Sequence, residues 1–294
     1  MAFQPTSRDV EISEEEFRLL RDFIHEKLGI YFDEGHKASL RSRLSGRLNR
    51  LDLLSFEDYY HYLRFGPDRN EELARMITHL TNNETYFFRE AGQLHAFSDN
   101  VLRLIKERKT KRGDRRLRVM SAGCSTGEEV HTLAMILHET GQFFWNWDVQ
   151  IIGLDVDHIA LEKAKRAVYH HNSFRSTSPE IVERHFVKQG SGAMQVKDSL
   201  RKFVRFAQGN ILEASSYEPL RPVDVIVCRN VLIYFSDQAT LRAVRLFHDA
   251  LVPGGYLLLG HAESLSRISD MFVPIRFKGA MIYQKPDPRP AGES

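Results

Sequence analysis

Apolar side chains recur at helical spacing through the first 80 residues of the chain. A helix is predicted to begin after Ser13, because Glu16 stands three positions later in a capping-box pattern. A similar pattern at Ser55 and Asp58 predicts another helix start. The apolar stripes of the first two helices are Phe17, Leu20, Ile24 and Leu28, and then Leu40, Leu44, Leu48 and Leu51. We therefore predict a small all-helical N-terminal domain over residues 10–80.

Beyond residue 115 the pattern changes to short β-rich runs that alternate with amphipathic helices. Such alternation predicts a parallel sheet with right-handed crossovers and a ligand crevice at the carboxyl ends of the strands. The predicted strands are 117–122, 149–155, 203–206, 223–228, 256–260 and 281–283, the last of which closes the sheet. We predict a doubly wound, Rossmann-like α/β domain over residues 116–285. Residues 81–115 are expected to form a linker and a helix that contribute to its ligand site.

One stretch, at about 175–202, does not follow this alternation. Phe186–Lys188 and Gln195–Lys197 flank Gly190–Gly192, a pattern that predicts a small hairpin. We interpret the stretch as a β insertion on the sheet. The proline-rich tail from Pro286 is expected to be disordered.

The stretch from Ser121 to Glu129 carries the most informative chemistry. A strand, a glycine turn and a helix N-terminus together form the usual nucleotide-cofactor corner of a doubly wound sheet. Here the turn reads Gly123-x-x-x-Gly127, and two acids follow it. Two carboxylates would repel a pyrophosphate, whereas they would favour the sulfonium and ammonium groups of S-adenosylmethionine. The alternative is a tight turn whose acids only favour the start of a helix.

Polar residues also follow the other predicted strands. Asp155 ends the second strand, where a carboxylate can accept hydrogen bonds from both ribose hydroxyls of an adenosine. An acid at this position can equally be a helix N-cap. Asn210, Arg229 and Asn230 follow later strands. These side chains are expected at the same edge of the sheet.

The segment 80–90 is unusual in composition, with two amides, two threonines and three consecutive aromatic residues. It does not fit a regular amphipathic period. One interpretation is a buried connector between domains, in which the aromatic rings pack. The other has the rings form an apolar wall while Asn83, Thr85 and Arg89 point into a ligand site. The sequence leaves both open.

Composition excludes several classes of protein. The net charge of +2 does not identify a partner, and a hydrophobic content of 42% suffices for a full core. Cys124 and Cys228 are far apart and form neither a disulfide framework nor a metal-binding spacing. The first residues lack a signal-peptide pattern, and no apolar run approaches the roughly 20 residues that span a bilayer. We expect a soluble cytoplasmic protein without a metal.

Positive charge is concentrated in the second predicted helix. Between Gly35 and Leu51 the chain has five cationic residues and no acid, namely Lys37, Arg41, Arg43, Arg47 and Arg50. Such a helix favours a polyanionic partner, either a nucleic acid or an acidic protein surface, although a solvated face is the simpler interpretation. A second basic run, from Lys106 to Arg118, is interpreted as a solvated linker.

Four motifs in this order resemble the chemotaxis receptor methyltransferase family over nearly the whole chain. They are Asn83-x-Thr85-x-x-Phe88-Arg89-Glu90, Ser121-Ala122-Gly123-Cys124-Ser125-Thr126-Gly127-Glu128-Glu129, Cys228-Arg229-Asn230-Val231-x-Ile233-Tyr234-Phe235 and Gly260-His261-x-Glu263-Ser264. Members of that family transfer a methyl group from S-adenosylmethionine to glutamate side chains of bacterial chemoreceptors. One departure is visible, because Val130-His131 stands where many members have Pro-Tyr. We expect it to leave the chemistry unchanged.

The resemblance implies a set of site residues and a partner. The cofactor, which leaves as S-adenosylhomocysteine, is expected to contact Asn83, Thr85, Arg89, Glu129, Asp155, Asn210, Ile211, Arg229 and Asn230. Arg89 is also expected to pair with a carboxylate, and Tyr234 to orient the methyl acceptor, so these two are the candidate catalytic residues. The basic helix 35–51 would dock the cytoplasmic helical region of a chemoreceptor. The protein would then reach the membrane only through the receptor.

The implied reaction is an in-line displacement at the methyl carbon. A glutamate nucleophile is already ionised at pH 7, because its ordinary pKa is near 4.3. No general base is required, and catalysis depends on alignment and on removal of water from the carboxylate. Two alternatives stay open. One is a nucleic-acid methyltransferase, although the strand ending at Cys228 lacks the Asn-Pro-Pro-Tyr-like turn that base-methylating enzymes often use, and the other is a non-catalytic cofactor-binding adaptor.

Overall fold

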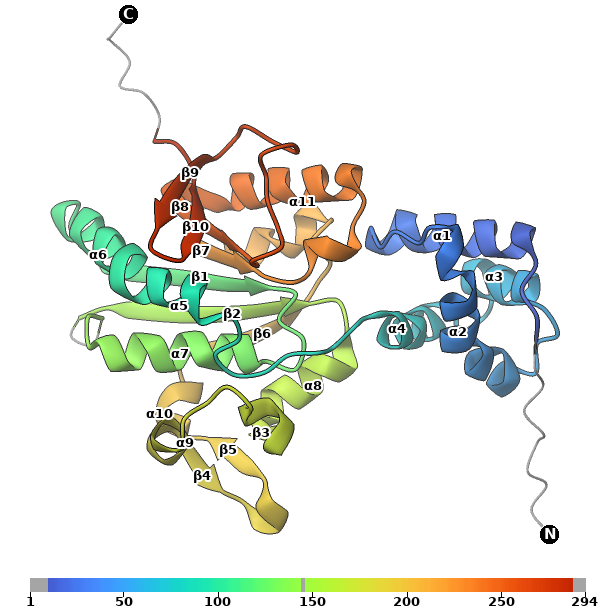
Figure 1. Ribbon diagram of the computed structural model, residues 1–294, viewed down its shortest axis with the longest axis horizontal. Coiled ribbons are helices and arrows are strands. Elements are labelled where there is room, and N and C mark those ends of the chain that lie inside the picture. Colours follow the sequence, from blue (N-terminus) through green and yellow to red (C-terminus); the bar gives the residue numbers. More distant parts are fainter. Residues whose placement is uncertain (1–9, 144–145, 288–294) are drawn as a thin grey trace, which may run out of the picture. The chain divides into compact units, whose positions relative to one another are not determined.

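The computed structural model describes residues 10–143 and 146–287, which form two compact units (Figure 1). The helical unit runs to Asn82 and includes Tyr234–Ser236. The sheet-containing unit comprises Asn83–Ile233 and the chain from Asp237 onward. Residues 288–294, which hold most of the tail predicted to be disordered, lie outside the described residues.

The helical unit begins as the capping patterns predict. Its helices are α1 (Glu14–Leu28), η1 (Glu34–His36), α2 (Lys37–Leu51), α3 (Phe56–Phe65) and α4 (Arg69–Leu80). The Ser13 hydroxyl accepts a hydrogen bond from the Glu16 N–H at 3.2 Å, and the Glu16 carboxylate accepts one from the Ser13 N–H at 2.8 Å. The Ser55 hydroxyl caps α3 by accepting a hydrogen bond from the Asp58 N–H at 3.0 Å. The predicted apolar stripes are buried in the core of this unit, except for Leu51 at the end of α2, which is partly exposed.

A short segment from late in the sequence completes the helical unit. Ile30 and Phe235 form an isolated antiparallel bridge, and the Tyr31 N–H donates to the Tyr234 carbonyl at 2.8 Å. Ser236 and His25 join their side chains by a 2.8 Å hydrogen bond. The chain that follows the fourth strand of the parallel sheet therefore contributes three residues to the packing of the helices.

The second unit is built on a seven-stranded sheet of order β6-β2-β1-β7-β8-β10-β9. Its strands are β1 (Arg116–Ala122), β2 (Asp148–Asp155), β6 (Val204–Gln208), β7 (Val223–Cys228), β8 (Leu251–Leu259), β9 (Val273–Phe277) and β10 (Ala280–Gln284). β1 pairs in parallel with β2 and β7, β2 with β6, and β7 with β8. β10 is antiparallel to both of its neighbours. The predicted doubly wound α/β class is confirmed.

The prediction that residues 281–283 close the sheet is wrong. They belong to β10, and β9 lies outside it at the edge. β9 carries Pro274 and is mostly exposed, so it shows neither an apolar run nor a clear alternation. An edge strand tolerates proline because one side of its backbone needs no partner. These same features hid the strand from pattern analysis.

Helices cover both faces of the sheet. α7 (Glu128–Thr140) and α8 (His158–Arg166) lie on one side, and α11 (Asp237–Ala250) lies on the other, against β8 (Figure 1). The helix predicted within residues 81–115 spans α5 (Ala91–Ala96), a π-helical stretch η2 (Phe97–Val101) and α6 (Leu102–Lys111). The first residues of the basic run 106–118, interpreted as a solvated linker, therefore lie in α6. The buried side chains of α5, η2 and α6 join α7 and alternate residues of the strands in one apolar core.

The predicted hairpin of the insertion is present, and it belongs to a three-stranded sheet of order β3-β5-β4. The strands are β3 (Val168–Tyr169), β4 (Phe186–Lys188) and β5 (Met194–Val196). The additional strand has only two residues, too few for a recognisable pattern. The flanking helices are η3 (His171–Phe174), α9 (Pro179–His185), η4 (Gly190–Gly192) and α10 (Asp198–Arg201). Short helices η5 (Ala214–Ser216), η6 (Glu218–Leu220) and η7 (Leu232–Tyr234) occur in later loops.

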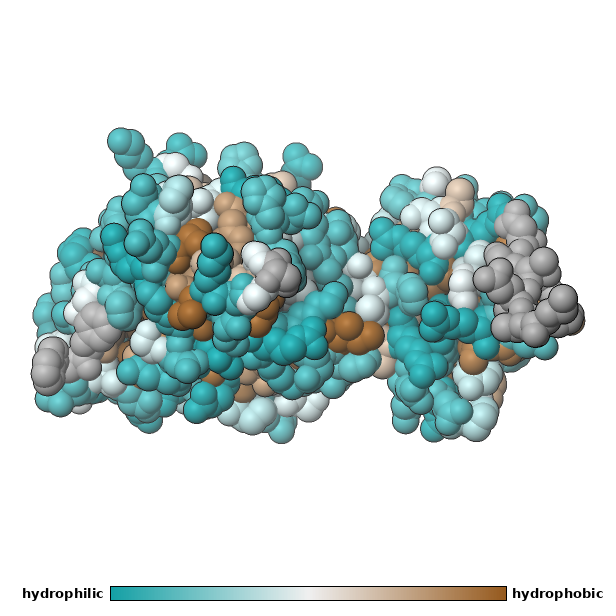
Figure 2. Space-filling model, turned by 90° about the horizontal axis from the view of Figure 1, so that it is seen from below, coloured by the Kyte–Doolittle hydropathy of each residue, from teal (hydrophilic) through white to brown (hydrophobic). Residues whose placement is uncertain are grey.

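Figure 2 shows a face composed mostly of hydrophilic residues, with small apolar groups scattered between them. Within residues 10–143 and 146–287, every helix is too short or too polar to cross a lipid bilayer.

Candidate active site

The glycine turn between β1 and α7 has no room for larger side chains. Gly123 and Gly127 have φ values of +79° and +91°, a left-handed conformation that favours glycine. A Cβ on Gly123 would lie 2.5 Å from a methyl carbon of Val231, and one on Gly127 would lie 2.8 Å from the Cβ of Ala164. The turn therefore requires glycine at both positions. It holds the N-terminus of α7 between α8 and the loop that follows β7.

The two acids that follow the turn have different surroundings. Glu128 is buried and accepts hydrogen bonds from two hydroxyl groups, at 2.6 and 2.9 Å. Glu129 accepts from the Ser121 hydroxyl at 2.7 Å and from Arg229 Nη1 at 3.1 Å. Burial raises the pKa of Glu129, although the charge of Arg229 and the bond from Ser121 oppose the shift. The side chain of Glu129 keeps 14% of its surface exposed, so this acid can still meet a ligand.

Arg229 connects three segments of the chain. Its Nη1 donates to Glu129, and its Nη2 donates to the carbonyl of Arg89 and lies 3.5 Å from Glu90 Oε2. The neighbouring Asn230 donates from its amide to Glu90 Oε1 at 2.8 Å. Arg229 Nε is buried and has no acceptor within the described chain. The start of α7, the end of β7 and the segment before α5 thus form one charged cluster, which we call the Arg229 cluster.

Glu90 is held ionised within the Arg229 cluster. Burial opposes ionisation, but hydrogen bonds from Asn230 and the His261 N–H, with the charge of Arg229, keep the pKa of Glu90 below its usual value. Glu90 ends the sequence motif that begins at Asn83, and the sequence alone assigned it no function. Its partners are about 140 and 170 positions away in the sequence, so no local signal could have identified them.

Several residues around this cluster have strained backbone conformations. Phe88, Glu90, Ser125 and Asn230 have φ values of +57°, +53°, +48° and +59°. Left-handed conformations of such residues cost on the order of 1–3 kcal/mol each and persist only where surrounding contacts hold them. All four residues lie in the sequence motifs that carry the family resemblance, and this concentration of strained residues indicates a functional site.

Glu263 anchors the loop that follows β7. Its Oε1 accepts from the N–H groups of Val231 and Leu232 at 2.9 and 2.8 Å, and its Oε2 accepts from those of Asn230 and Gly260 at 2.9 and 2.6 Å. A single carboxylate therefore fixes the backbone that presents Asn230. Glu263 lies in the sequence motif that begins at Gly260. The sequence alone assigned it no function, because only the fold brings the donors to it.

Asp155 lies at the end of β2 and is 7% exposed. Its Oδ2 accepts from the Ser125 N–H at 2.7 Å and its Oδ1 from the Asp157 N–H at 2.8 Å. Burial raises the pKa of Asp155 to about 6, although these bonds oppose the shift. The N-cap of α8 is Asp157, which accepts from the Ile159 N–H at 2.9 Å. The alternative that Asp155 is a helix cap is therefore wrong, and its remaining lone pairs stay available to a ligand.

Asn83 joins the segment 83–90 to this carboxylate pair. Its amide nitrogen donates to Asp157 Oδ2 at 2.9 Å, and its amide oxygen accepts from the Ser125 hydroxyl at 3.0 Å. Phe87, in contrast, is fully buried against the rings of Tyr169, Phe174 and Phe186. Phe87 therefore packs as the first interpretation predicts. Asn83 contacts Asp157 and Ser125, and its role toward a ligand stays a prediction.

Arg89 and Thr85 are less firmly placed by their contacts. The Arg89 guanidinium donates to the Glu84 carbonyl at 2.8 Å and lies 5.7 Å from the centre of the Tyr86 ring. Both Arg89 and Thr85 are half-buried. Arg89 contributes to the Arg229 cluster through its backbone carbonyl, and its side chain stays available for a carboxylate.

Asn210 and Ile211 follow β6. The Asn210 N–H donates to the Ser216 hydroxyl at 3.0 Å, and its side-chain oxygen accepts from the Leu212 N–H at 3.0 Å. Ile211 is 6% exposed, and its carbonyl accepts from the buried Tyr217 hydroxyl at 2.9 Å. The loop is thus locally rigid. It adjoins the end of β2, because the Gly209 N–H donates to the Asp155 carbonyl.

Tyr234, predicted to orient the acceptor, belongs to the helical unit. Its carbonyl accepts from the Tyr31 N–H, and its hydroxyl accepts from the Asn82 amide at 2.9 Å. The side chain is 38% exposed. Its assignment as a catalytic residue stays a prediction.

The predicted docking helix needs correction at Arg47. Arg47 is 3% exposed and forms a buried ion pair with Glu72, with the Arg47 Nε at 2.9 Å from Glu72 Oε1. It therefore has no surface to offer a partner. Lys37 and Arg41 also form ion pairs, Lys37 with Glu14 at 2.5 Å and Arg41 with Glu11 at 2.9 Å. Both acids lie outside α2.

Two of the five predicted docking residues keep exposed side chains without an acid beside them in the described chain. Arg43 is exposed and donates to the Leu80 carbonyl at 2.6 Å, and Arg50 is exposed near the end of α2. The positive surface of the helix is therefore smaller than its sequence suggests.

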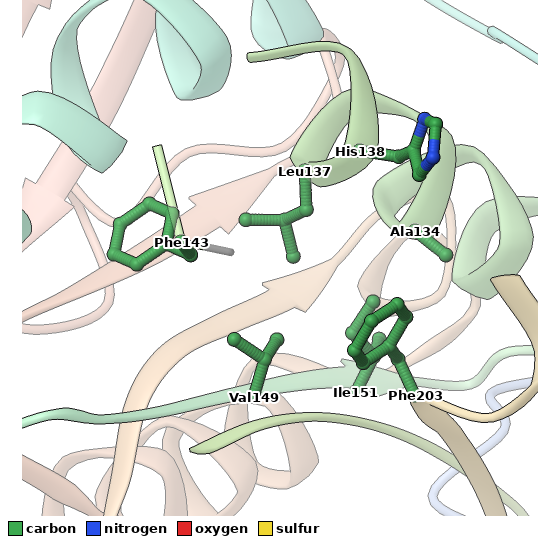
Figure 3. A pocket seen from close by; sticks show the side chains of 7 residues that line it. All are labelled: Ala134, Leu137, His138, Phe143, Val149, Ile151 and Phe203. Carbon is green, nitrogen blue, oxygen red and sulfur yellow. The ribbon is translucent and has the colours of Figure 1, made fainter. Parts of the chain in front are cut away.

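A cavity of about 20 Å³ lies under the C-terminal half of α7, and three of its lining residues are partly exposed (Figure 3). Its lining is almost wholly apolar and comprises Ala134, Leu137, His138, Phe143, Val149, Ile151 and Phe203. This volume suits at most one water molecule. The cavity is a packing defect and cannot hold an adenosine.

His131, at the position where the sequence departs from the family pattern, is 1% exposed. Its ring contacts the rings of Tyr169 and Phe206 edge-on, with centroids 6.0 and 5.8 Å away. Burial lowers the pKa of His131 to about 4, so it is neutral at pH 7. Its surroundings are those of a core residue.

The arrangement suits a ligand that carries positive charge and hydroxyl groups. The side chain of Glu129 is partly exposed at the glycine turn, and Asp155 keeps unused lone pairs at the end of the next strand. Both acids lie close to Cys124, whose thiol pKa burial and these two negative charges raise. The residues therefore fit the ribose and ammonium groups of S-adenosylmethionine.

Comparison with known proteins gives two matches to family models that together cover most of the chain. Residues 83–280 match the CheR methyltransferase, SAM binding domain. Residues 15–81 match the CheR methyltransferase, all-alpha domain.

Curated relatives align over nearly their full length. Chemotaxis protein methyltransferase 2 of Vibrio cholerae is 36% identical over 278 residues, which cover 95% of each chain. The chemotaxis protein methyltransferase of Escherichia coli K12 is 32% identical over 287 residues, covering 96% of this chain and 94% of the relative. Chemotaxis protein methyltransferase 1 of Pseudomonas aeruginosa is 32% identical over 276 residues, covering 92% and 97%.

Proposed function

The chain belongs to the CheR methyltransferase family, and from that premise we propose that it methylates glutamate side chains of bacterial chemoreceptors to form methyl esters. The observation that carries the proposal is the Glu129 carboxylate, which the glycine turn presents and which Ser121 and Arg229 hold in place. A negatively charged glycine turn suits a cationic methyl donor and disfavours a phosphate cofactor.

The residues that would hold S-adenosylmethionine divide by chemistry. Asp155 would accept hydrogen bonds from the ribose hydroxyls, because its two oxygens have lone pairs beyond those used by Ser125 and Asp157. Glu129 would face the ammonium group. The rigid loop at Asn210 and Ile211 would frame the adenine.

When bound, S-adenosylmethionine supplies a methyl group on a sulfonium sulfur. The chain then needs only to align an acceptor carboxylate, which is ionised at pH 7, so no basic side chain has to remove a proton. Arg89 would orient that carboxylate through its half-buried guanidinium. Tyr234 would contact the acceptor through its partly exposed ring. Alignment of this kind can supply about 7–11 kcal/mol of the barrier reduction.

The partner is proposed to be the acidic helical region of a chemoreceptor, docked by the positive side chains of α2. Arg43 and Arg50 would contribute most, since Lys37 and Arg41 already pair with acids of the helical unit. Arg47 is excluded from this surface by its burial. Such a substrate places the enzyme in the cytoplasm, at the membrane only through the receptor.

A nucleic-acid substrate has less support. Part of the positive charge of the basic run 106–118 is neutralised by nearby acids, because Lys109 pairs with Asp114 and Asp224 at 2.9 Å and Arg118 pairs with Asp148. A strand of phosphates would need those cations to be free.

The test is transfer of labelled methyl from S-adenosylmethionine to receptor-containing membranes, followed by mild alkali. The expected result is label on a receptor-sized band that alkali releases as methanol, which identifies a carboxyl ester. The Glu129→Gln enzyme serves as the matched control and should transfer far less label. Label on nucleic acid, or alkali-stable label on protein, would contradict the proposed substrate.

A further inference from the structure

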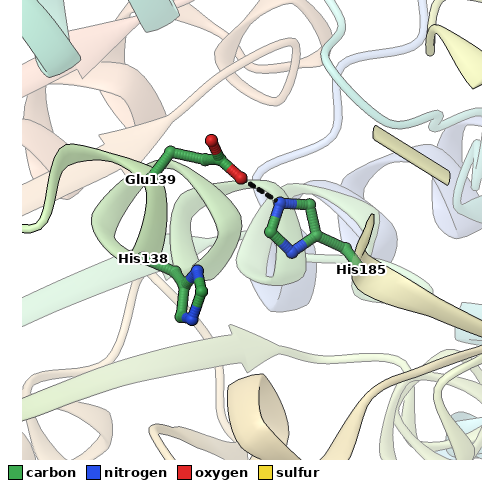
Figure 4. A group of neighbouring side chains, drawn as sticks. All are labelled: His138, Glu139 and His185. Carbon is green, nitrogen blue, oxygen red and sulfur yellow. Dashed lines mark hydrogen bonds and ion pairs between the residues drawn. The ribbon is translucent and has the colours of Figure 1, made fainter. Parts of the chain in front are cut away.

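Three side chains with metal-binding atoms meet at the C-terminal end of α7. His138 and Glu139 lie in the last turn of α7, and His185 ends α9 (Figure 4). One ligand atom from each lies within 4.8 Å of those of the other two. Because a helix rises about 1.5 Å per residue, Glu139 is on the order of 15 Å along α7 from Glu129. The cluster is therefore separate from the cofactor site.

The carboxylate in this cluster is already oriented. Glu139 Oε1 lies 2.6 Å from His185 Nε2, and its Oε2 accepts from Arg184 Nη1 at 2.6 Å. The rings of His138 and His185 meet edge to face, with centroids 5.6 Å apart. His185 is 2% exposed, whereas His138 and Glu139 are reached from solvent. A hydrogen bond to the second carboxylate oxygen, as from Arg184 to Glu139 Oε2, commonly positions a metal-binding carboxylate.

We propose that His138, Glu139 and His185 form a binding site for a divalent transition-metal ion, with Zn²⁺ as the ion that fits best. Two imidazoles and one carboxylate are a common zinc ligand set, with water in the fourth position. Ca²⁺ and Mg²⁺ are disfavoured, because they require several oxygen ligands. Metal–ligand distances of about 2.0–2.2 Å require the three ligand atoms to lie roughly 3.4 Å apart. Rotation of the partly exposed His138 side chain and of the exposed Glu139 side chain would achieve this.

Metal binding would connect the insertion to the main sheet. α9 leads directly into β4 of the three-stranded sheet, and α7 packs on β1, β2 and β6. An ion shared by α7 and α9 would stabilise their contact by mass action, and the effect would grow with the concentration of free metal. Hydrogen exchange in residues 179–188 should then become slower when the ion is bound.

The experiment uses the full chain without a polyhistidine tag, freed of metal by a chelator. Zn²⁺ binding is measured by calorimetry, and Co²⁺ is used as a spectroscopic probe of the ligands. Variants His138→Ala and Glu139→Gln each remove one ligand from a side chain that is not fully buried. His95→Ala, at an exposed histidine of α5, is the matched control. Mg²⁺ is the control ion.

The expected result is one Zn²⁺ bound per chain in the wild type and in His95→Ala. The Kd should rise at least about tenfold in His138→Ala and in Glu139→Gln, with slower exchange in residues 179–188 only where Zn²⁺ binds. Unchanged circular dichroism would show that the variants are folded. Zn²⁺ affinities that are equal in all four proteins would overturn the proposal, as would an equal response to Mg²⁺.

Discussion

Each unit of the molecule buries an arginine–glutamate pair, and the two pairs have different surroundings. In the helical unit, Arg47 binds both oxygens of Glu72, at 2.9 and 2.5 Å, and the buried Tyr59 hydroxyl donates to the same carboxylate at 2.8 Å. Arg229 instead divides its N–H groups between carboxylates and a carbonyl, and its Nε has no acceptor in the described chain. The side chain of its partner Glu129 is partly exposed.

The two pairs therefore differ in the accessibility of their glutamates: Glu72 has only a structural role, whereas a ligand could reach Glu129. Glu72 is 1% exposed and meets three donors, so a partner molecule has no access to it. A buried pair of this kind contributes to stability mainly because either member alone would be an uncompensated buried charge. Glu129 has fewer donors than its lone pairs allow, and a cationic ligand would complete its surroundings.

The largest expected effect is the loss of stability when the buried Arg47–Glu72 pair is broken. Glu72→Gln leaves Arg47 without its counter-charge and should lower the free energy of unfolding of the helical unit by about 3–5 kcal/mol. Hydrogen exchange of α2 and α4 measures the loss. Cofactor affinity should be unchanged, because the substitution lies outside the sheet-containing unit.

A neighbouring residue supplies the control for this prediction. Glu71 pairs with Arg75 on the same helix, and their side chains are 63% and 46% exposed, so Glu71→Gln should change exchange little. If both variants exchanged at the same rate, the buried pair would not be what holds these helices together.

The same Glu→Gln change in the Arg229–Glu129 pair should affect cofactor affinity and not stability, the reverse of the effect expected for Glu72→Gln. Glu129→Gln keeps hydrogen-bond acceptors for Ser121 and Arg229 but removes the charge that faces the ligand. We expect S-adenosylmethionine to bind about 10–100-fold more weakly, which corresponds to roughly 1.4–2.7 kcal/mol, with a small change in stability. Calorimetric titration measures the affinity. Glu128→Gln is the control, and an equal loss in that variant would remove the distinction between the two acids.

The smallest effect is a pH dependence of cofactor affinity. The pKa of Asp155 is about 6, above its ordinary value of 3.8, because the group is buried. Its contribution to folding stability is therefore full below pH 3.8 and is lost as the pH rises through about 6. Ribose hydroxyls favour the ionised form, so the Kd of S-adenosylmethionine should rise as the pH falls below 6, by up to about tenfold per unit.

Two variants identify the group responsible for this pH dependence. Asp155→Asn should bind weakly with a flatter profile between pH 5 and 7. Glu129, whose pKa burial also raises, acts in the same direction, so Glu129→Gln should keep the part due to Asp155. A wild-type Kd that stays constant from pH 7 to 5 would show that Asp155 does not bind the ligand in its ionised form.

Much of the fold could be predicted from local patterns. The capping box at Ser13 and the alternation of strands and helices gave the right elements, since each depends on residues a few positions apart. β9 escaped, because an exposed strand with a proline has no distinctive pattern. The glycine turn was found because Gly123 and Gly127 are required by their own backbone conformation.

The pairing of charges could not be predicted in the same way. Arg47 was predicted to face a partner because no acid stands near it in α2, yet Glu72 lies 25 positions away in the sequence and beside it in the fold. Glu263 had no assigned function until the structure placed four backbone N–H groups, from two segments of the chain, around its carboxylate. Ion pairs of this kind form wherever packing brings two segments together.

The sequence by itself determined the class of fold, the position of the glycine turn and the acids that follow it, because periodicity and backbone preference are local properties. Only the tertiary structure decided which acid keeps a partly exposed side chain, which arginine is buried, that Tyr234 packs with the helical unit, and that His138, Glu139 and His185 meet. These outcomes depend on contacts between segments 25 to more than 100 residues apart, and such contacts are set by how the helices and strands pack.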